Sequence, residues 1–206
     1  MSQRLAVFVS GRGSNLESLL KGLAGHSTGT VVLVVSDRVG APALDHARSA
    51  HIPTATVEAD DGTGQLEILA AHAVDWIVLA GYLKRVPKAV VAHYRNRILN
   101  IHPALLPRHG GPGMYGLRVH EAVLTAGDTE SGASVHLVDE EYDHGPVVAQ
   151  RRVRVEPEDT PASLARRVLA AEHALLSEVV IAAVEGRLRT EDDRAWIEGA
   201  NCLSAE

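Results

Sequence analysis

The chain has 206 residues, enough for one domain with a sizeable core, and 46% of them are hydrophobic, which excludes a wholly disordered protein. Its net charge of −6 and its aromatic content of 3% argue against binding to a nucleic-acid backbone or stacking on single-stranded bases. No apolar run approaches the roughly twenty residues that span a bilayer, and the start of the chain is too short and polar for a signal peptide. Because Cys202 is the only cysteine, we expect a cytoplasmic protein without disulfides.

The first half of the chain alternates strand and helix patterns. Four short apolar runs are typical of parallel strands buried on both faces, namely 5–9, 31–35, 77–80 and 98–101. Helical spacing and flanking residues predict helices between them, namely one after Asn15 and others at 43–50, 65–72 and 88–93. This β-α-β rhythm predicts an α/β fold with a doubly wound, mostly parallel open sheet of Rossmann-like type.

The second half predicts an extension of this sheet. Segments 133–137 and 146–155 are rich in β-forming residues and flank an acidic loop, so they predict a hairpin. A long apolar helix follows, with Thr160 as its N-cap, Pro161 in its first turn and Gly186 near its end.

Segment 108–117 is rich in glycine, which makes a helix or strand improbable there. It predicts either a mobile lid beside a site or an ordinary surface turn, and the sequence does not choose between them.

Three polar residues suit acyl transfer without a metal. Asn100 lies in the predicted strand at 98–101, His102 directly follows it, and Asp143 lies in the acidic loop. An amide can donate to a developing oxyanion, an imidazole can donate or exchange a proton near neutral pH, and a carboxylate can take a proton from an attacking amine. Alone they are weak evidence, because a histidine after a buried strand is often a structural residue.

The glycine loop at 11–15 follows a predicted strand and precedes a predicted helix. Its backbone N–H groups and the helix N-terminus can bind an anion such as a phosphate monoester. It is not the dinucleotide fingerprint, because Leu16 stands where the third glycine is needed. The alternative is a tight structural turn with Asn15 as the helix N-cap.

Motifs in a fixed order cover nearly the whole chain, namely SGRGSN at 10–15, AGY at 80–82, LNIHPALLP at 99–107, GASVH at 132–136, Asp143, and EH at 172–173. Together they resemble the folate-dependent phosphoribosylglycinamide formyltransferases. The segment 100–107 resembles enzymes that use 10-formyltetrahydrofolate in general, and the glycine loop resembles the purine-pathway branch. The resemblance implies transfer of a formyl group from 10-formyltetrahydrofolate to the amine of 5′-phosphoribosylglycinamide, as a step of purine biosynthesis.

The resemblance also implies site residues. The catalytic residues would be Asn100, His102 and Asp143. The nucleotide substrate would be bound by Gly13, Ser14, Asn15 and Glu172, although composition alone favours an exposed helix charge at Glu172. The folate would be held by Leu83, Lys84, Arg85, Val86, Asn100, Asp139, Glu140, Glu141 and Tyr142.

We expect one domain over 1–206, with a nucleotide-binding half at 1–100, a folate and catalytic half at 101–189 and a tail at 190–206. Small molecules are the expected partners, without nucleic acid or membrane, and a homodimer is one possible assembly. No metal is expected, because the eleven histidines lack the paired spacings of zinc ligands.

Two departures from the family pattern limit what the resemblance assigns. Segment 108–117 looks longer and richer in glycine than in many relatives, and segment 60–64 lacks the arginine that often contacts the folate tail. Two alternatives also remain. One is another enzyme that uses 10-formyltetrahydrofolate, such as a hydrolase or a formyltransferase for nucleotide sugars or methionyl-tRNA, although the hydrolase and the tRNA enzyme usually carry an extra domain. The other is a non-catalytic module that binds a nucleotide or a folate.

Overall fold

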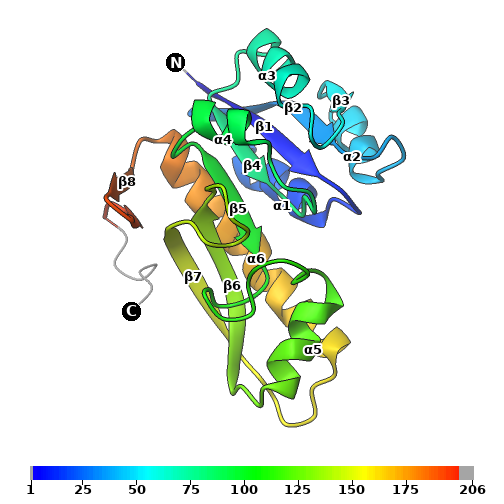
Figure 1. The fold of residues 1–206 in the computed structure, drawn as a ribbon, viewed down its shortest axis with the longest axis vertical. Coiled ribbons are helices and arrows are strands. Elements are labelled where there is room, and N and C mark those ends of the chain that lie inside the picture. The colour runs from blue at the N-terminus through cyan, green and yellow to red at the C-terminus, as the bar shows by residue number, and fades with distance from the viewer. Residues whose placement is uncertain (1, 200–206) are drawn as a thin grey trace.

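The computed structural model describes residues 2–199, and its centre is a seven-stranded sheet. The strands are β1 (Gln3–Val9), β2 (Gly29–Ser36), β3 (Thr54–Thr56), β4 (Trp76–Leu79), β5 (Ile98–His102), β6 (Glu130–Leu137) and β7 (Val147–Arg154). They lie in the order β3-β2-β1-β4-β5-β6-β7 (Figure 1). The strands from β3 to β5 pair in parallel, and β6 is antiparallel to both of its neighbours.

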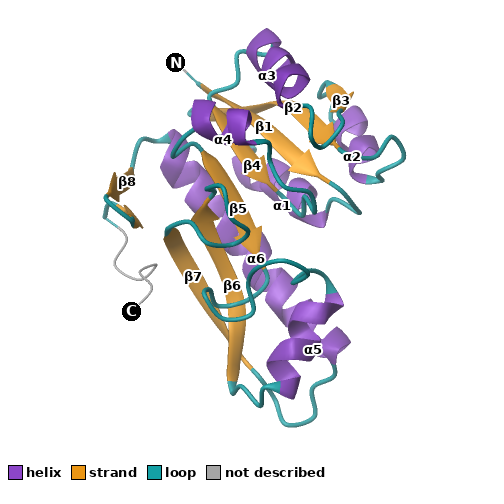
Figure 2. Cartoon of the chain, in the orientation of Figure 1, coloured by secondary structure: helices purple, strands orange, loops and turns teal. Residues whose placement is uncertain are grey.

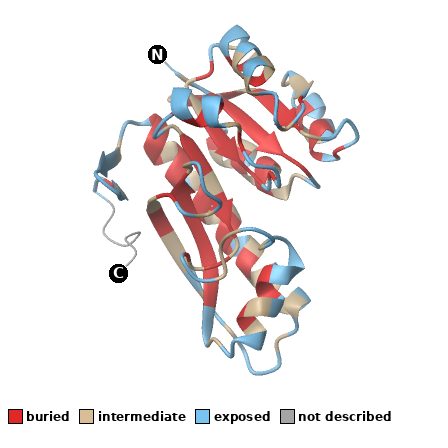
Figure 3. Cartoon of the chain, in the orientation of Figure 1, coloured by how far each residue is buried: buried red, intermediate tan, exposed pale blue. Residues whose placement is uncertain are grey.

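Helices cover both faces of the sheet (Figure 2). They are α1 (Ser14–Leu23), α2 (Ala43–Ser49), α3 (Gly62–Ala71), α4 (Lys88–His93), α5 (Leu117–Thr125) and α6 (Pro161–Val184). Apolar residues of α1, α2 and α6 form one buried cluster with the sheet, and those of α3 and α4 form another. The central strands are buried along most of their length (Figure 3), as expected of a parallel sheet covered on both sides. The predicted α/β fold is confirmed.

Some elements were not predicted from the sequence. They are the short strand β3, helix α5, and a separate hairpin formed by β8 (Leu188–Glu191) and β9 (Arg194–Ile197). The hairpin occupies part of the expected tail, whereas Cys202 lies outside the described residues. Within residues 2–199, no helix is long and apolar enough to cross a membrane.

The alternative reading of the glycine loop, with Asn15 as the N-cap of helix α1, is wrong about the cap. The N-cap is Gly13, with a φ of 85°, and Asn15 lies inside the first turn. A Cβ on residue 13 would lie 2.6 Å from the Cβ of Ala43, so this position needs glycine for space as well as for its backbone angle. The side chain of Asn15 is thereby free for another contact.

The predicted cap of helix α6 is confirmed. The Thr160 hydroxyl accepts a hydrogen bond from the Ser163 N–H at 3.2 Å, and the Ser163 hydroxyl accepts one from the Thr160 N–H at 2.9 Å. This reciprocal pair satisfies two N–H groups that the helix itself leaves unbonded. The helix then packs along β5, β6 and β7.

Replacing Thr160 with alanine is expected to lower the free energy of unfolding by about 1 kcal/mol, because the Ser163 N–H loses its acceptor. Urea denaturation measures the change. The matched control is Thr125→Ala at the exposed end of α5, which is expected to change the same quantity by less than about 0.5 kcal/mol. Equal losses in both variants would contradict the capping role.

Candidate functional site

A cavity of about 750 Å³ lies at the carboxyl ends of the central strands. This is the edge where open α/β sheets bind ligands, because the loops that follow the strands diverge there. The loops after β1 and β4 are joined by two hydrogen bonds, from the Ser10 N–H to the Gly81 carbonyl at 3.2 Å and from the Leu83 N–H to the Ser10 hydroxyl at 2.9 Å. These hydrogen bonds hold the two loops together at the base of the cavity.

The glycine-rich loop forms part of the cavity wall. All residues from 111 to 117 line it, and helix α6 contributes Ala165, Leu169 and Glu172 on another side. The sequence left open whether this segment is a lid beside a site or an ordinary surface turn. Its place in the cavity wall favours a segment that belongs to the site.

Asn100, His102 and Asp143 meet at this cavity. The Asn100 amide nitrogen lies 3.3 Å from Asp143 Oδ1, and His102 Nδ1 lies 3.4 Å from Asp143 Oδ2. Strand β5 positions the first two side chains, and the loop between β6 and β7 brings the carboxylate to them. The carboxylate therefore contacts both an amide donor and an imidazole.

The Asn100 amide is oriented by His136, which the sequence did not single out as a site residue. Antiparallel pairing sets Asn100 opposite His136 on β6, and the Asn100 Nδ2 lies 2.9 Å from His136 Nε2. The other ring nitrogen of His136 donates to the Leu137 carbonyl at 2.9 Å, so in the neutral ring Nε2 accepts. The amide must then present its N–H groups to both His136 and Asp143.

The His102 ring is held between two acceptors. Its Nε2 donates to the His109 carbonyl at 2.8 Å, and its Nδ1 faces the Asp143 carboxylate. Burial lowers the pKa of His102, while the Asp143 charge and the His109 carbonyl act in the opposite direction, and the lowering prevails. The side chain of His102 is only 4% exposed.

Asp143 is held as a carboxylate. Burial acts to raise its pKa, but the nearby His102 ring and the Gly111 N–H, which donates to Oδ2 at 2.9 Å, favour the ionised form. The net effect is a lowered pKa. Asp143 can therefore accept a proton at neutral pH.

Asn15 and Glu172 line the same cavity and contact each other. The Asn15 amide donates to Glu172 Oε2 at 2.8 Å, and both residues line the cavity. Glu172 is 7% exposed, so the reading of an exposed helix charge is wrong. The adjacent Arg12 also lines the cavity, whereas Gly13 and Ser14 do not.

Burial raises the pKa of Glu172 to about 7, against a smaller opposing effect of the Asn15 hydrogen bond. The carboxyl group of the unfolded chain titrates near 4.5, so between that pH and about 7 the folded state binds more protons than the unfolded state. Stability therefore falls as pH rises through this window and then levels off. The loss amounts to roughly 3 kcal/mol, taking about 1.4 kcal/mol for each pKa unit.

The variant Glu172→Gln is expected to remove this dependence, because an amide does not titrate and its oxygen can still accept from Asn15. Urea unfolding at pH 4.5 and pH 8 measures the change. The variant should match the wild type at pH 4.5 and exceed it at pH 8 by roughly 3 kcal/mol. A loss of stability with pH that is the same in both proteins would show that Glu172 is not its source.

Of the residues predicted to contact the folate, only some line the cavity. Leu83, Tyr142 and Asn100 line it; Lys84, Arg85, Val86, Asp139, Glu140 and Glu141 do not. Asp139 and Glu140 instead fix the loop before Asp143. The Asp139 carboxylate lies 2.7 Å from His144 Nδ1, and the Glu140 carboxylate lies 2.6 Å from Lys88 Nζ.

Two further cavity residues were missed. The Tyr82 hydroxyl and His120 Nδ1 are buried and have no hydrogen-bond partner among the described residues, and both side chains belong to residues that line the cavity. Buried polar atoms are rarely left unpaired, so these two are suited to a polar ligand. Tyr82 stands in a motif that sequence analysis singled out, but His120 carries no such signal.

Groups that could hold a metal were also sought. Within residues 2–199, no group of three or more His, Cys, Asp or Glu side chains is placed to bind one.

Known proteins resemble this chain over most of its length. A family described as "Formyl transferase" matches residues 3–180. The chain is 46% identical over 200 residues to a chloroplastic phosphoribosylglycinamide formyltransferase of Arabidopsis thaliana, covering 93% of this chain and 68% of that protein. It is 36% identical over 203 residues to the phosphoribosylglycinamide formyltransferase of Escherichia coli K12, covering 95% and 93%. The crystal structure of the Anaplasma phagocytophilum enzyme of that name superimposes with a TM-score of 0.89 at 35% identity, covering 98% of both chains.

Proposed function

Because the chain belongs to the formyl transferase family, we propose that it transfers the formyl group of 10-formyltetrahydrofolate to the amine of 5′-phosphoribosylglycinamide, in purine biosynthesis. One observation carries the proposal. The amide of Asn100, the imidazole of His102 and the carboxylate of Asp143 converge on a single cavity, which Asn15 and Glu172 also line.

In this proposal the Asn100 amide stabilises the oxygen of the formyl group as it becomes negative. Its hydrogen bond to Asp143, at 3.3 Å, is the longer of its two and can be exchanged for one to the developing oxyanion. One well-placed donor of this kind contributes about 3 kcal/mol to lowering the barrier.

Asp143 takes the proton that the attacking amine loses, as the new carbon–nitrogen bond forms. That proton then passes to N10 of the folate as the bond from N10 to the formyl carbon breaks, which releases tetrahydrofolate. The lowered pKa of Asp143 keeps the carboxylate ready to accept the amine proton at neutral pH. His102 lies against the other oxygen of the carboxylate and holds it in place, and its lowered pKa makes it a neutral ring at neutral pH. His102 contributes through position, because its Nε2–H is already donated to the His109 carbonyl.

The end of the cavity near Arg12, Asn15 and Glu172 suits the nucleotide substrate. The N-terminus of α1 and the Arg12 guanidinium favour a phosphate there, and Glu172 can accept from hydroxyl groups. The part that is lined by Leu83 and Tyr142 suits the folate. A volume of about 750 Å³ lies within the range of small-molecule sites.

The same proposal includes three expectations from the sequence. They are a cytoplasmic location, small-molecule partners, and a division into a nucleotide-binding half at 1–100 and a folate and catalytic half at 101–189.

Purified protein mixed with 10-formyltetrahydrofolate and 5′-phosphoribosylglycinamide tests the proposal. We expect formylated nucleotide, detected by mass spectrometry, in amounts equal to the tetrahydrofolate released. Donor consumption without formylated nucleotide, also in a reaction with water alone, would identify a hydrolase or an enzyme with another acceptor. Binding of either compound without turnover would identify a binding module.

A further inference from the structure

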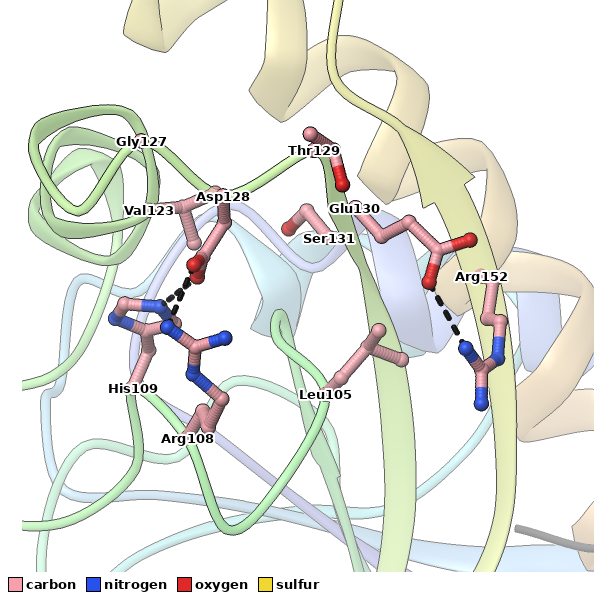
Figure 4. A pocket seen from close by; sticks show the side chains of 10 residues that line it. All are labelled: Leu105, Arg108, His109, Val123, Gly127, Asp128, Thr129, Glu130, Ser131 and Arg152. Carbon is pink, nitrogen blue, oxygen red and sulfur yellow. Dashed lines mark hydrogen bonds and ion pairs between the residues drawn. The ribbon is translucent and has the colours of Figure 1, made fainter. Parts of the chain in front are cut away.

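The backbone and the ring of His109 make contacts in two different places. Its backbone carbonyl accepts the hydrogen bond from His102 Nε2 at 2.8 Å, and His102 lines the main cavity. Its ring faces away into a second pocket of about 380 Å³, where its Nε2 lies 2.7 Å from Asp128 Oδ2 (Figure 4). One residue thus connects the proposed catalytic histidine with an ion pair outside the cavity.

The backbone of His109 adopts a conformation that needs support. Its φ is 56°, in the left-handed region that residues other than glycine rarely adopt. The ring is 14% exposed and is fixed on the Asp128 carboxylate, which is 10% exposed and also pairs with Arg108. The anchored ring therefore stabilises the turn that directs the carbonyl toward His102.

The same turn supports Asp143. The Gly111 N–H donates to Asp143 Oδ2, and a Cβ on residue 110 would lie 3.1 Å from the Asp143 Cβ. The segment 109–111 thus packs directly on the carboxylate, where glycine at 110 permits the approach. A shift of the turn would disturb both His102 and Asp143.

The carbonyl decides which nitrogen of His102 carries its proton. A carbonyl oxygen only accepts, so Nε2 must hold hydrogen in both the neutral and the charged ring. Nδ1 then has a lone pair toward Asp143 when the ring is neutral and a proton toward it when the ring is charged. Without the carbonyl, the neutral ring would place its hydrogen on Nδ1, bonded to the carboxylate, and Asp143 would lose capacity to accept the amine proton.

We propose that His109, anchored by Asp128, is a positioning residue that fixes the Nε2–H tautomer of His102 and keeps the Asp143 carboxylate available. This rests on the formyl transfer proposed above. His109 touches neither substrate in this account and acts only through its carbonyl. The ring nitrogen of His109 donates, and the Asp128 carboxylate accepts.

Several charged groups face this arrangement. Arg108 and Asp128 lie at the His109 ring, and Glu130 pairs with Arg152 across the second pocket (Figure 4). Asp143, His136 and His120 lie on the side of His102. The charge of these groups changes with pH, so the dependence of kcat on pH is compared only among variants that keep all of them.

Two variants remove the anchor in different ways. Asp128→Ala removes the acceptor, and His109→Gly removes the ring but allows the same φ without strain. Both are expected to lower kcat about tenfold or more, since a small misplacement of a catalytic group is costly, with the KM of either substrate within about twofold. Asp128→Asn keeps an acceptor oxygen and should recover most of the activity. Arg108→Ala removes only the exposed partner of Asp128 and should stay near the wild type.

The ¹⁵N NMR signals of the His102 ring give a readout that does not depend on activity. The wild type should show the Nε2–H tautomer, whereas Asp128→Ala and His109→Gly should shift toward Nδ1–H. An unchanged tautomer together with unchanged kcat in both variants, with thermal melting showing that they are folded, would overturn the inference. Absence of transfer by the wild type would instead overturn the proposed function, and the NMR comparison would still decide the role of His109.

Discussion

Replacing Asp143 with asparagine is expected to lower kcat for formyl transfer about 10³-fold, with smaller changes in the KM of either substrate. An amide cannot take the proton that the attacking amine loses, so the tetrahedral adduct reverts instead of going on to product. The change also removes the negative charge that lies 3.4 Å from His102 Nδ1. Because that charge opposes the lowering of the His102 pKa, the variant should hold a neutral His102 over a wider range of pH.

Steady-state assays with both substrates varied measure this effect. The matched control is Asp45→Asn, the same chemical change on a carboxylate that is 78% exposed on α2 and pairs with Arg48. It should leave kcat within about twofold of the wild type, as expected of a surface substitution. If Asp143→Asn retained more than about a tenth of the wild-type kcat, proton transfer by this carboxylate could not be the source of the rate.

Most of the sheet was predictable because its signals are local. The runs at 5–9, 31–35, 77–80 and 98–101 became β1, β2, β4 and β5 with small shifts of their ends, since a strand buried on both faces must be continuously apolar. Helix α5 and the hairpin of β8 and β9 were not predicted. Helix α5 does carry a helical pattern, with Val119 and Val123 buried on one face, but it is short and directly follows the glycine-rich segment. The hairpin lies in polar sequence, and packing against β7 and α6 decides its structure.

The site was predictable only in part, for a different reason. Strand ends and a motif were enough to suggest Asn100, His102 and Asp143, which the structure brings together. The contact of His136 depends on the register between β5 and β6, and the contact of His109 depends on a turn with positive φ. The spacing of residues along the sequence predicts neither. Glu172 shows the same limit. Its burial depends on how the middle of α6 faces the sheet and α1, so composition gave the wrong reading.

Replacing Asn100 with alanine is expected to lower kcat by about 10²- to 10³-fold, because the developing oxyanion loses its donor. The substitution also leaves His136 Nε2 and Asp143 Oδ1 without the amide, so part of the loss could come from their movement. The variant His136→Gln separates the two effects, since it removes the partner of the amide and keeps the amide itself. It should lower kcat about tenfold at most.

The double variant Asn100→Ala with Asp143→Asn tests whether the two residues serve the same step. The losses of kcat from residues that act on one transition state are not additive in free energy. If the amide and the carboxylate serve the same step, the double variant should lose far less activity than the product of the two single losses. Asn100→Ala should also retain binding of a folate analogue within about tenfold, since its main effect is on the transition state and not on the ground state. If Asn100→Ala lowered kcat no more than His136→Gln does, the amide would be a structural partner of β6, and stabilisation of the oxyanion would have to come from another group at the cavity.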